Sequence, residues 1–128
     1  MTEGDFRRMV LALEGAVETA HMGHPDFRAH GRIFATLRHE PTTCGVVMLT
    51  PEQQQAFLER SPGFTPESGA WGRSGCTRVL LDAVDDEMVG EAVTLAWQNA
   101  AAKAAAKKAS AARTRKRSVA TKKRVVRR

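Results

Sequence analysis

The sequence predicts an α+β fold, with an antiparallel sheet and flanking helices, followed by a basic tail. Helical periodicity marks both ends of the first 100 residues, and a period of two lies between them. Gly and Pro separate the short apolar segments, as they do between antiparallel neighbours. The charge is divided sharply. Residues 1–100 hold all 14 acidic residues against 8 arginines, whereas residues 101–128 hold 12 cations and no acid.

The first elements are a helix and a hairpin. In "TEGDFRRMVLALEG" (residues 2–15), Thr2 can cap, Asp5 follows three residues later, and the apolar residues recur at helical spacing. "DFRAHGRIFATL" (residues 26–37) has strand-like segments on both sides of His30-Gly31, a dipeptide that favours a two-residue hairpin turn. "HEPTT" then predicts a longer turn before a buried strand, "CGVVMLT" (residues 44–50).

The second half predicts a helix, a loop, a strand and a last helix. Thr50 caps and Pro51 takes the first helical position of a helix that ends before Pro62. "FTPESGAWGRSG" (residues 64–75) is expected to be a loop, and "CTRVLLDAV" a strand. The last helix begins at Asp85-Asp86-Glu87 and shows an apolar face as far as Trp97. The expected order is α-β-β-β-α-β-α, in one domain over residues 1–100.

One hundred residues suffice for one modest core. The expected core residues are Phe6, Val10, Leu11, Phe27, Ile33, Phe34, Leu37, Val46, Val47, Leu49, Phe57, Leu58, Val79, Leu81, Val89, Val93 and Trp97. The sequence shows neither an apolar run of membrane-spanning length nor a cleavable signal pattern, so a cytoplasmic location is expected.

Residues 101–128 form a distinct tail. Its first part is rich in Ala and Lys, has high helix propensity and lacks large apolar residues, so it is expected to extend the last helix into solvent. "RTRKRSVATKKRVVRR" (residues 113–128) is a run of like charges and is expected to be disordered.

Three separated motifs resemble the MmcQ/YjbR family of small bacterial proteins. They are "GHPDFRAHGRIFATL", "VVMLTPEQQQAFL" and "PESGAWGRSGCTRVLLD", and the resemblance covers about residues 3–97. It implies a double-wing α+β fold and a DNA-binding role, and it implies no catalytic residues. Arg32 stands where the family often has lysine, and Cys76 where it often has tryptophan. The tail lies outside the family's domain and resembles the Lys/Ala-rich extensions of some nucleoid proteins and linker histones.

Histidines are concentrated between residues 21 and 30. His21 and His24 are three residues apart, and His30 or Asp26 could supply a third zinc ligand. On the hairpin interpretation, however, His21 and His30 lie at opposite ends of a strand, too far apart for one ion. We therefore expect no metal site and favour a hairpin with solvated or hydrogen-bonded histidines, with pH sensing as a further alternative.

The remaining candidate groups for chemistry are two cysteines and a set of acids. Cys44 and Cys76 begin β-branched runs, which favours buried thiols over a catalytic nucleophile. Asp82, Asp85, Asp86 and Glu87 lie at a strand end and a helix start, which favours helix capping over cation binding. We therefore predict no enzyme activity and no cofactor.

The body offers tentative DNA contacts at arginines. Arg28 and Arg32 flank the hairpin turn, and Arg73 and Arg78 bracket a glycine-rich segment beside Trp71. Arginines at a wing tip can contact phosphate or enter a groove. The opposing interpretation is that they are surface arginines paired with local acids, since this part of the chain carries a net charge of −6.

The tail supplies the strongest functional signal. Its cations are Lys103, Lys107, Lys108, Arg113, Arg115, Lys116, Arg117, Lys122, Lys123, Arg124, Arg127 and Arg128. This charge without aromatic residues favours sequence-independent binding to duplex DNA, because single strands need stacking platforms. It favours DNA over a membrane, because no apolar face accompanies it. The alternative interpretation is that the tail only keeps the protein soluble and meets acidic surfaces incidentally.

Two functions follow from these signals. The leading hypothesis is a non-enzymatic, nucleoid-associated DNA-binding protein. The alternative is a body that binds a small ligand, or performs unrecognised chemistry, in a concave face near Trp71, Arg73 and the "HPDF" segment (residues 24–27), with a tail that only localises it. The tail could also fold back onto the acidic patch at residues 85–87 and inhibit DNA binding.

Overall fold

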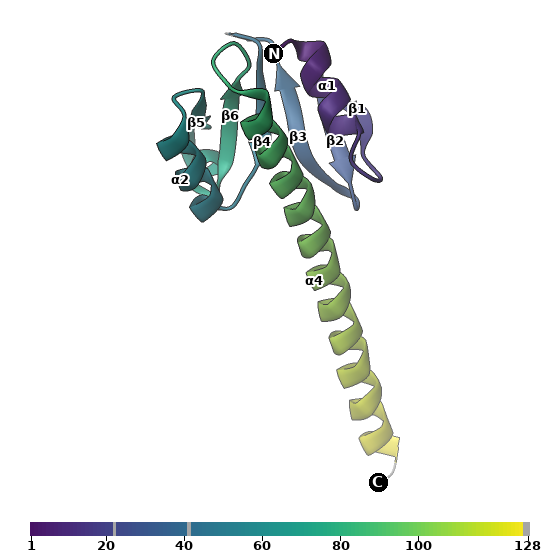
Figure 1. The fold of residues 1–128 in the computed structure, drawn as a ribbon. Coiled ribbons are helices and arrows are strands. Elements are labelled where there is room, and N and C mark those ends of the chain that lie inside the picture. The colour runs from purple at the N-terminus through teal and green to yellow at the C-terminus, as the bar shows by residue number, and fades with distance from the viewer. Residues whose placement is uncertain (22, 41, 127–128) are drawn as a thin grey trace.

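The computed structural model describes the backbone of residues 1–21, 23–40 and 42–126, and the side chains as far as Thr114 except that of His21 (Figure 1). The elements in chain order are α1 (Glu3–Leu11), β1 (Val17–His21), β2 (His24–Ala29), β3 (Arg32–Arg38), β4 (Cys44–Met48), α2 (Pro51–Arg60), β5 (Phe64–Pro66), α3 (Gly69–Arg73), β6 (Cys76–Leu80) and α4 (Asp86–Val126).

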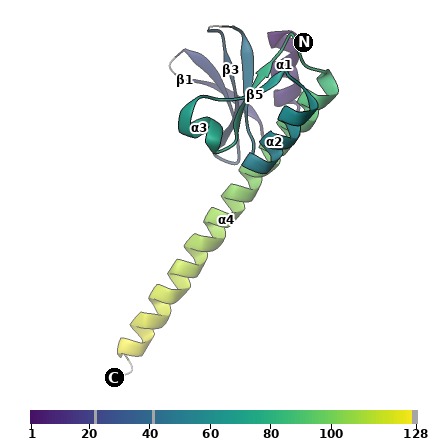
Figure 2. The same ribbon diagram turned by 90° about the vertical axis from the view of Figure 1, so that its left-hand side faces the viewer.

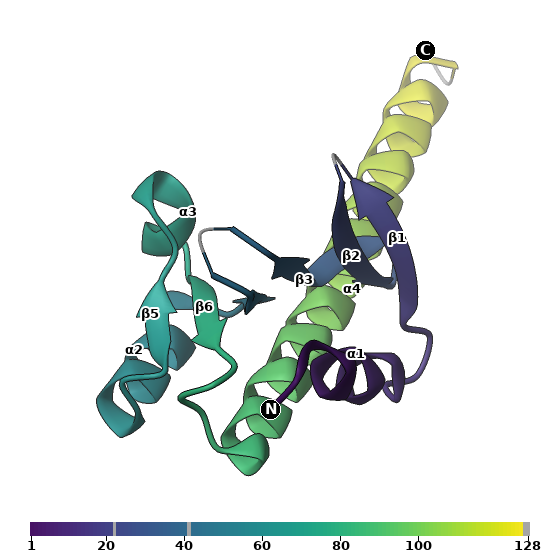
Figure 3. The same ribbon diagram turned by 90° about the horizontal axis from the view of Figure 1, so that it is seen from above.

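The strands form one six-stranded antiparallel sheet in the order β1-β2-β3-β4-β6-β5. Seen from above, β1 and β2 lie on one side of α4, whereas β5, β6, α2 and α3 lie on the other (Figure 3). We call these two groups the first wing and the second wing. The predicted α+β class with an antiparallel sheet and flanking helices is confirmed, and the arrangement is consistent with a double-wing fold.

Local sequence signals explain the first helices and the hairpin. Thr2 and Thr50 each cap a helix through a complete capping box, and Pro51 occupies the first turn of α2. In the turn between β2 and β3, φ is +56° at His30 and +74° at Gly31. A type I′ turn requires positive φ at both central residues, so this predicted hairpin is confirmed.

Helices α1 and α4 cover one face of the sheet, which carries the core. The ring of Phe6 in α1 packs directly on Gly45 of β4, where a Cβ atom would lie 2.7 Å from ring carbons. The fully buried large side chains are Phe6, Val10, Phe27, Phe34, Leu37, Val46, Val47, Phe64, Val79, Val89 and Val93. Glycine at position 45 therefore lets α1 approach the sheet closely.

Several expectations about single elements are corrected. Residues 17–21 form an edge strand, β1, and the expected loop over residues 64–75 contains both β5 and α3. Phe64 belongs to the core, whereas Leu11, expected in the core, is 38% exposed at the end of α1. Tertiary contacts explain β5, because Phe64 packs against Phe57 of α2 with ring centroids 5.0 Å apart.

Helix α4 runs across the sheet and continues far beyond it (Figures 1 and 2). The helix has no break near residue 100, and the described backbone is helical as far as Val126. The sequence contains no Gly or Pro after Gly90 that would end the helix, and the packed part has already overcome the cost of nucleation. In the described part of the chain, no helix is apolar enough over a sufficient length to cross a bilayer.

Candidate functional site

The second face of the sheet lies opposite the core. We call it the inner face. Cross-strand pairing places Thr36, Val46 and Arg78 on it in neighbouring strands, and Met48 beside Cys76. The core residues of the same strands, such as Val47, point to the other face.

A pocket of about 500 Å³ lies at one end of the sheet, where the inner face meets α4. Both wings and α4 line it: Arg28, Arg32, Ile33 and Thr36 from β2 and β3, Met48 from β4, Trp71 and Ser74 from α3 and its end, and Asn99 and Lys103 from α4. This volume lies within the range that small-molecule sites usually have. The pocket is therefore large enough for a small organic ligand.

The pocket wall is cationic. Arg28, Arg32 and Lys103 line it, and no Asp or Glu side chain does. No ion pair joins these three cations to an acid among the described side chains, and Arg28 Nε is buried there without a hydrogen-bond partner. Since cations without acidic partners attract negative charge, an anion in the pocket would stabilise this wall.

Trp71 forms the aromatic part of the pocket and is 72% exposed. The other tryptophan, Trp97, is half-buried and donates a hydrogen bond from Nε1 to the backbone oxygen of Glu14 at 2.8 Å. An exposed indole without comparable packing is the kind of side chain on which a planar ligand can stack.

The short helix α3, which presents Trp71, is held by Gln54 of α2. The buried amide Nε2 of Gln54 donates to the backbone oxygens of Gly72 at 3.0 Å and Cys76 at 3.1 Å. Gly72 lies against the backbone of Glu67, and Gly75, with φ of +111°, lies against Leu49. Any side chain at Gly72 or Gly75 would displace α3, so the motif "GAWGRSG" requires glycine at both positions.

Asn99 fixes α4 to the pocket floor. Its side-chain nitrogen donates to the backbone oxygen of Met48 at 3.1 Å and to Gln53 Oε1 at 2.8 Å. These contacts lie one helical turn before Lys103, so they place that lysine at the pocket edge. Asn99 is thus a positioning residue for the pocket.

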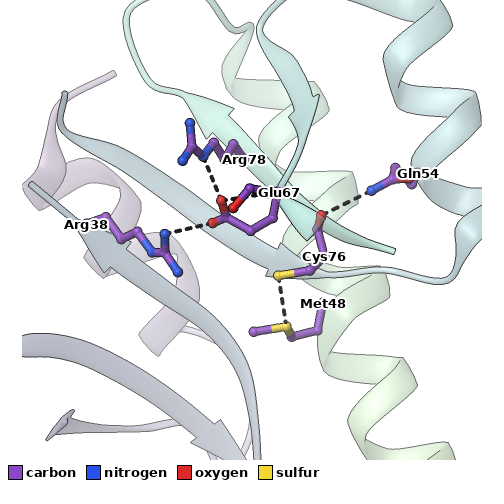
Figure 4. Close-up of polar contacts among 7 residues, drawn as sticks. Arg38, Met48, Gln54, Glu67, Cys76 and Arg78 are labelled. Carbon is purple, nitrogen blue, oxygen red and sulfur yellow. Dashed lines mark hydrogen bonds and ion pairs between the residues drawn. The ribbon is translucent and has the colours of Figure 1, made fainter. Parts of the chain in front are cut away.

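Glu67 lies between two arginines of the inner face (Figure 4). Its Oε1 accepts from Arg78 Nε at 3.0 Å, and its Oε2 lies 3.0 Å from Arg38 Nη1 in an ion pair without hydrogen-bond geometry. The carboxylate is 3% exposed, whereas the arginines are about one-third to two-fifths exposed. Arg78 is therefore paired with an acid, as one interpretation of the sequence expected.

Both cysteines lie on the inner face and are buried. Burial raises the pKa of the Cys44 thiol, and raises the pKa of the Cys76 thiol to about 11. Cys76 Sγ lies 3.6 Å from Met48 Sδ (Figure 4). A thiol with a raised pKa is a weak nucleophile at neutral pH.

The histidines are spread along the first wing. His24 begins β2 opposite His21 of β1, whereas His30 lies beyond the other end of β2 and contacts Trp97 with ring centroids 5.8 Å apart. Asp26 is buried between them, with Oδ2 unpaired among the described residues. Within the described residues, no three His, Cys, Asp or Glu side chains are grouped as metal ligands would be.

The acids at the start of α4 behave as capping residues. Asp85 Oδ1 accepts from the backbone nitrogen of Glu87 at 3.0 Å. Asp86 and Glu87 occupy the first turn of the helix, where its dipole favours negative charge. Asp82 is exposed just before this turn.

The tail begins at the pocket. Lys103 lines it, and Lys107, Lys108 and Arg113 are exposed further along α4. The tail cations whose side chains lie outside the described residues are Arg115, Lys116, Arg117, Lys122, Lys123, Arg124, Arg127 and Arg128. Among the body arginines, Arg73 is exposed at the end of α3 and does not line the pocket.

Comparison with known protein families decides the identity of the domain. The model of the YjbR family matches residues 11–99, which is more than half of the chain. The chain belongs to the YjbR family. Searches of the curated proteins and of the solved structures found no significant match. The YjbR match contains Arg28, Arg32 and Trp71 and stops before Lys103, so the cationic tail lies outside it.

Sequence reasoning located only part of this site. It placed a possible ligand site near Trp71, Arg73 and the "HPDF" segment, but it assigned Arg28 and Arg32 to DNA contacts. It also overlooked Glu67 and Gln54. The position of Lys103 beside the pocket could have been predicted from the spacing of apolar residues in the last helix. The buried stripe of α4 runs through Val89, Val93, Ala96 and Ala100, and the next position on that stripe is residue 103 or 104.

Proposed function

We propose that this YjbR protein is a non-enzymatic, nucleoid-associated protein that binds duplex DNA through the exposed part of α4. The observation that carries the proposal is the course of that helix. After Ala104, every residue to Thr114 is exposed, and no acid follows Glu91. The tail cations among the described side chains, Lys103, Lys107, Lys108 and Arg113, are therefore accessible to a polyanion.

The dimensions of the tail helix suit a duplex. Residues 101–126 span about 39 Å at ~1.5 Å per residue, close to one turn of B-DNA at roughly 34 Å. The major groove is about 12 Å wide and admits a helix. A helix that carries cations without acids can follow a groove or the phosphates beside it, with little preference for base sequence.

The body arginines contribute unequally to this proposal. Arg78 shares Glu67 with Arg38, so much of its charge is neutralised locally. Arg28 and Arg32 line the pocket beside Lys103, and Arg73 is exposed on the second wing. Of the arginines in residues 1–100 that were expected to contact DNA, Arg73 is thus the most accessible to a duplex.

The proposed fold-back of the tail meets a geometric constraint. Asp85, Asp86 and Glu87 lie at the start of α4, and the tail cations lie toward its other end. A continuous helix separates these two groups, so an intramolecular contact would require α4 to bend or unwind. Neutralising the patch with D85N, D86N and E87Q would raise DNA affinity if the contact inhibits binding.

The decisive experiment is fluorescence anisotropy on a labelled duplex of about one to two turns across a salt series. The full chain is compared with a variant in which the eleven tail cations beyond Lys103 are glutamine, a residue of similar helix propensity. If about half of the cations engage, log K falls against log salt with a slope of about −5 for the native chain. The variant should lose nearly all affinity and most of the slope.

A matched control is Arg60→Gln, which removes an exposed cation of α2 that pairs with Glu91. It should leave the affinity within twofold. Equal DNA binding by the native and tail-neutralised chains would contradict the proposal. Residual binding that Arg73→Gln abolishes would assign a direct contact to the second wing.

A further inference from the structure

We propose that the pocket between the wings binds a small organic anion that carries a planar ring. This site shares only Lys103 with the duplex-binding tail, and the inference does not depend on that function. It rests on three observations made at one place: a cavity of ligand size, a cationic wall and an exposed indole.

The charge of the wall selects an anion. Arg28 comes from β2, Arg32 from β3 and Lys103 from α4, so the three cations converge from different elements. Paired surface cations are common, but these have no acidic partner among the described side chains. Arg28 is partly exposed, and the guanidinium groups of Arg28 and Arg32 would donate to a phosphate or carboxylate oxygen.

The remaining surface selects a planar apolar ring. Trp71 stands on the wing opposite Arg28, and Ile33, Met48 and Leu49 supply apolar surface beside it. Ring stacking on an indole and burial against a thioether are favourable contacts for an aromatic group. The ligand would therefore place its ring at Trp71 and its anionic group at Arg28 and Arg32.

The surrounding structure keeps this arrangement in place. Gln54 and Gly72 hold α3, which carries Trp71, and Asn99 holds α4 one turn before Lys103. The nearby Glu67 is shared between Arg38 and Arg78, so it does not neutralise the pocket cations. A site whose walls are fixed by such contacts loses little entropy on binding.

The test is a calorimetric and fluorescence titration of the full chain near 150 mM salt. Adenosine 5′-monophosphate is the probe that has both ring and anion. Adenosine supplies the ring alone, and inorganic phosphate supplies the anion alone. We expect the monophosphate to bind at least tenfold more tightly than either fragment and to change the emission of Trp71. Equal affinity for probe and fragments, or no saturable binding, would overturn the proposal.

Neighbouring lysines provide the matched variants. Lys103→Gln removes a pocket cation, whereas Lys107→Gln removes the exposed cation one turn further along α4. We expect K103Q and Arg28→Gln to weaken the monophosphate at least fivefold, and K107Q to leave it within twofold. Lys103 is exposed, so its substitution leaves the core intact even if Arg28→Gln destabilises the fold. Equal effects of K103Q and K107Q would show general charge attraction and overturn the proposal.

A free nucleotide and a nucleotide within DNA both carry a planar ring and an anionic phosphate. A competition experiment shows which of the two the pocket binds. Saturating duplex DNA should leave monophosphate binding to the native chain unchanged. The assignment to a free ligand would be overturned if duplex DNA displaces the monophosphate from the native chain and if R28Q also weakens binding of the duplex.

Discussion

Gly72 of α3 lies directly against Glu67, and a Cβ atom on Gly72 would be 1.7 Å from the Glu67 backbone oxygen. We expect Gly72→Ala to destabilise the protein by about 3 kcal/mol, because the obstruction is backbone and cannot rotate away. Urea denaturation measures this loss. Gly69→Ala is the control: its φ is +66° but the space around it is open, so the expected loss is only about 1 kcal/mol. Equal losses would mean that α3 shifts freely.

Removing the charge of Glu67 should destabilise the inner face. Glu67→Gln leaves Arg38 and Arg78 without their shared carboxylate, and we expect a loss of about 2 kcal/mol, moderated because both arginines are partly solvated. The control, Glu91→Gln, breaks the exposed pair with Arg60 and should cost about 0.5 kcal/mol or less. Thermal unfolding compares the two, and a smaller loss for E67Q than for E91Q would contradict the role of burial.

The cap of α2 should make a measurable contribution to stability. Thr50 Oγ1 accepts from the Gln53 backbone nitrogen at 3.2 Å, and Gln53 Oε1 accepts from the Thr50 nitrogen at 2.9 Å. We expect Thr50→Ala to lower the free energy of unfolding by about 1 kcal/mol. Thr42→Ala, at an exposed position outside any helix, should change it by less than about 0.5 kcal/mol. Similar values for both variants would contradict the capping role.

The Cys76 thiol should resist alkylation in the folded protein. Burial raises its pKa to about 11, so the thiol remains protonated at pH 7 to 8. Iodoacetamide should label the native chain slowly and the urea-unfolded chain quickly, with mass spectrometry to locate the label. Because the folded pKa lies above the unfolded value of 9.0, the thiol also favours unfolding as the pH rises through 9 toward 11. Rapid labelling of Cys76 in the native state at pH 7 would contradict its burial.

The tail helix should respond to salt in the isolated protein. Like charges along residues 103–128 repel each other when helical, and salt screens this repulsion. We expect the helical signal in far-ultraviolet circular dichroism to rise from low salt to about 0.5 M. The variant with eleven neutral tail positions should show a high, salt-independent signal. A salt-independent native signal would show that repulsion does not limit the helix, contrary to the sequence-based expectation of disorder beyond residue 112.

Strong local signals predicted much of the fold. The caps at Thr2 and Thr50 and the His30-Gly31 turn each satisfy a backbone requirement within a few residues, so they are readable without tertiary structure. Strand β1 was missed because "VETAH" mixes polar and apolar residues on an edge of the sheet. Helix α3 was missed because Gln54 and the backbone of Glu67 stabilise it, and five residues with two glycines form no helix alone.

The candidate site was predictable only in fragments. The sequence identified Trp71, Arg28 and Arg32 as side chains that could contact a partner. They lie on α3, β2 and β3, and only the sheet order brings these elements together. The contribution of α4 depends on how it crosses the sheet, which the contacts of Asn99 with Met48 and Gln53 determine. Sequence spacing carries no information about such long-range pairings.

The unbroken course of α4 from Ala100, in the core, to Lys107, in the tail, has a consequence for orientation. Because the helix is rigid, a duplex bound by the tail would fix the rotation of the YjbR domain about the axis of α4 relative to the DNA. Each residue inserted between these two positions would turn the domain by about 100° about the helix axis and move it by ~1.5 Å. Insertions placed after Lys103 would thus vary the direction in which the pocket faces relative to the DNA, while the residues that line the pocket stay the same.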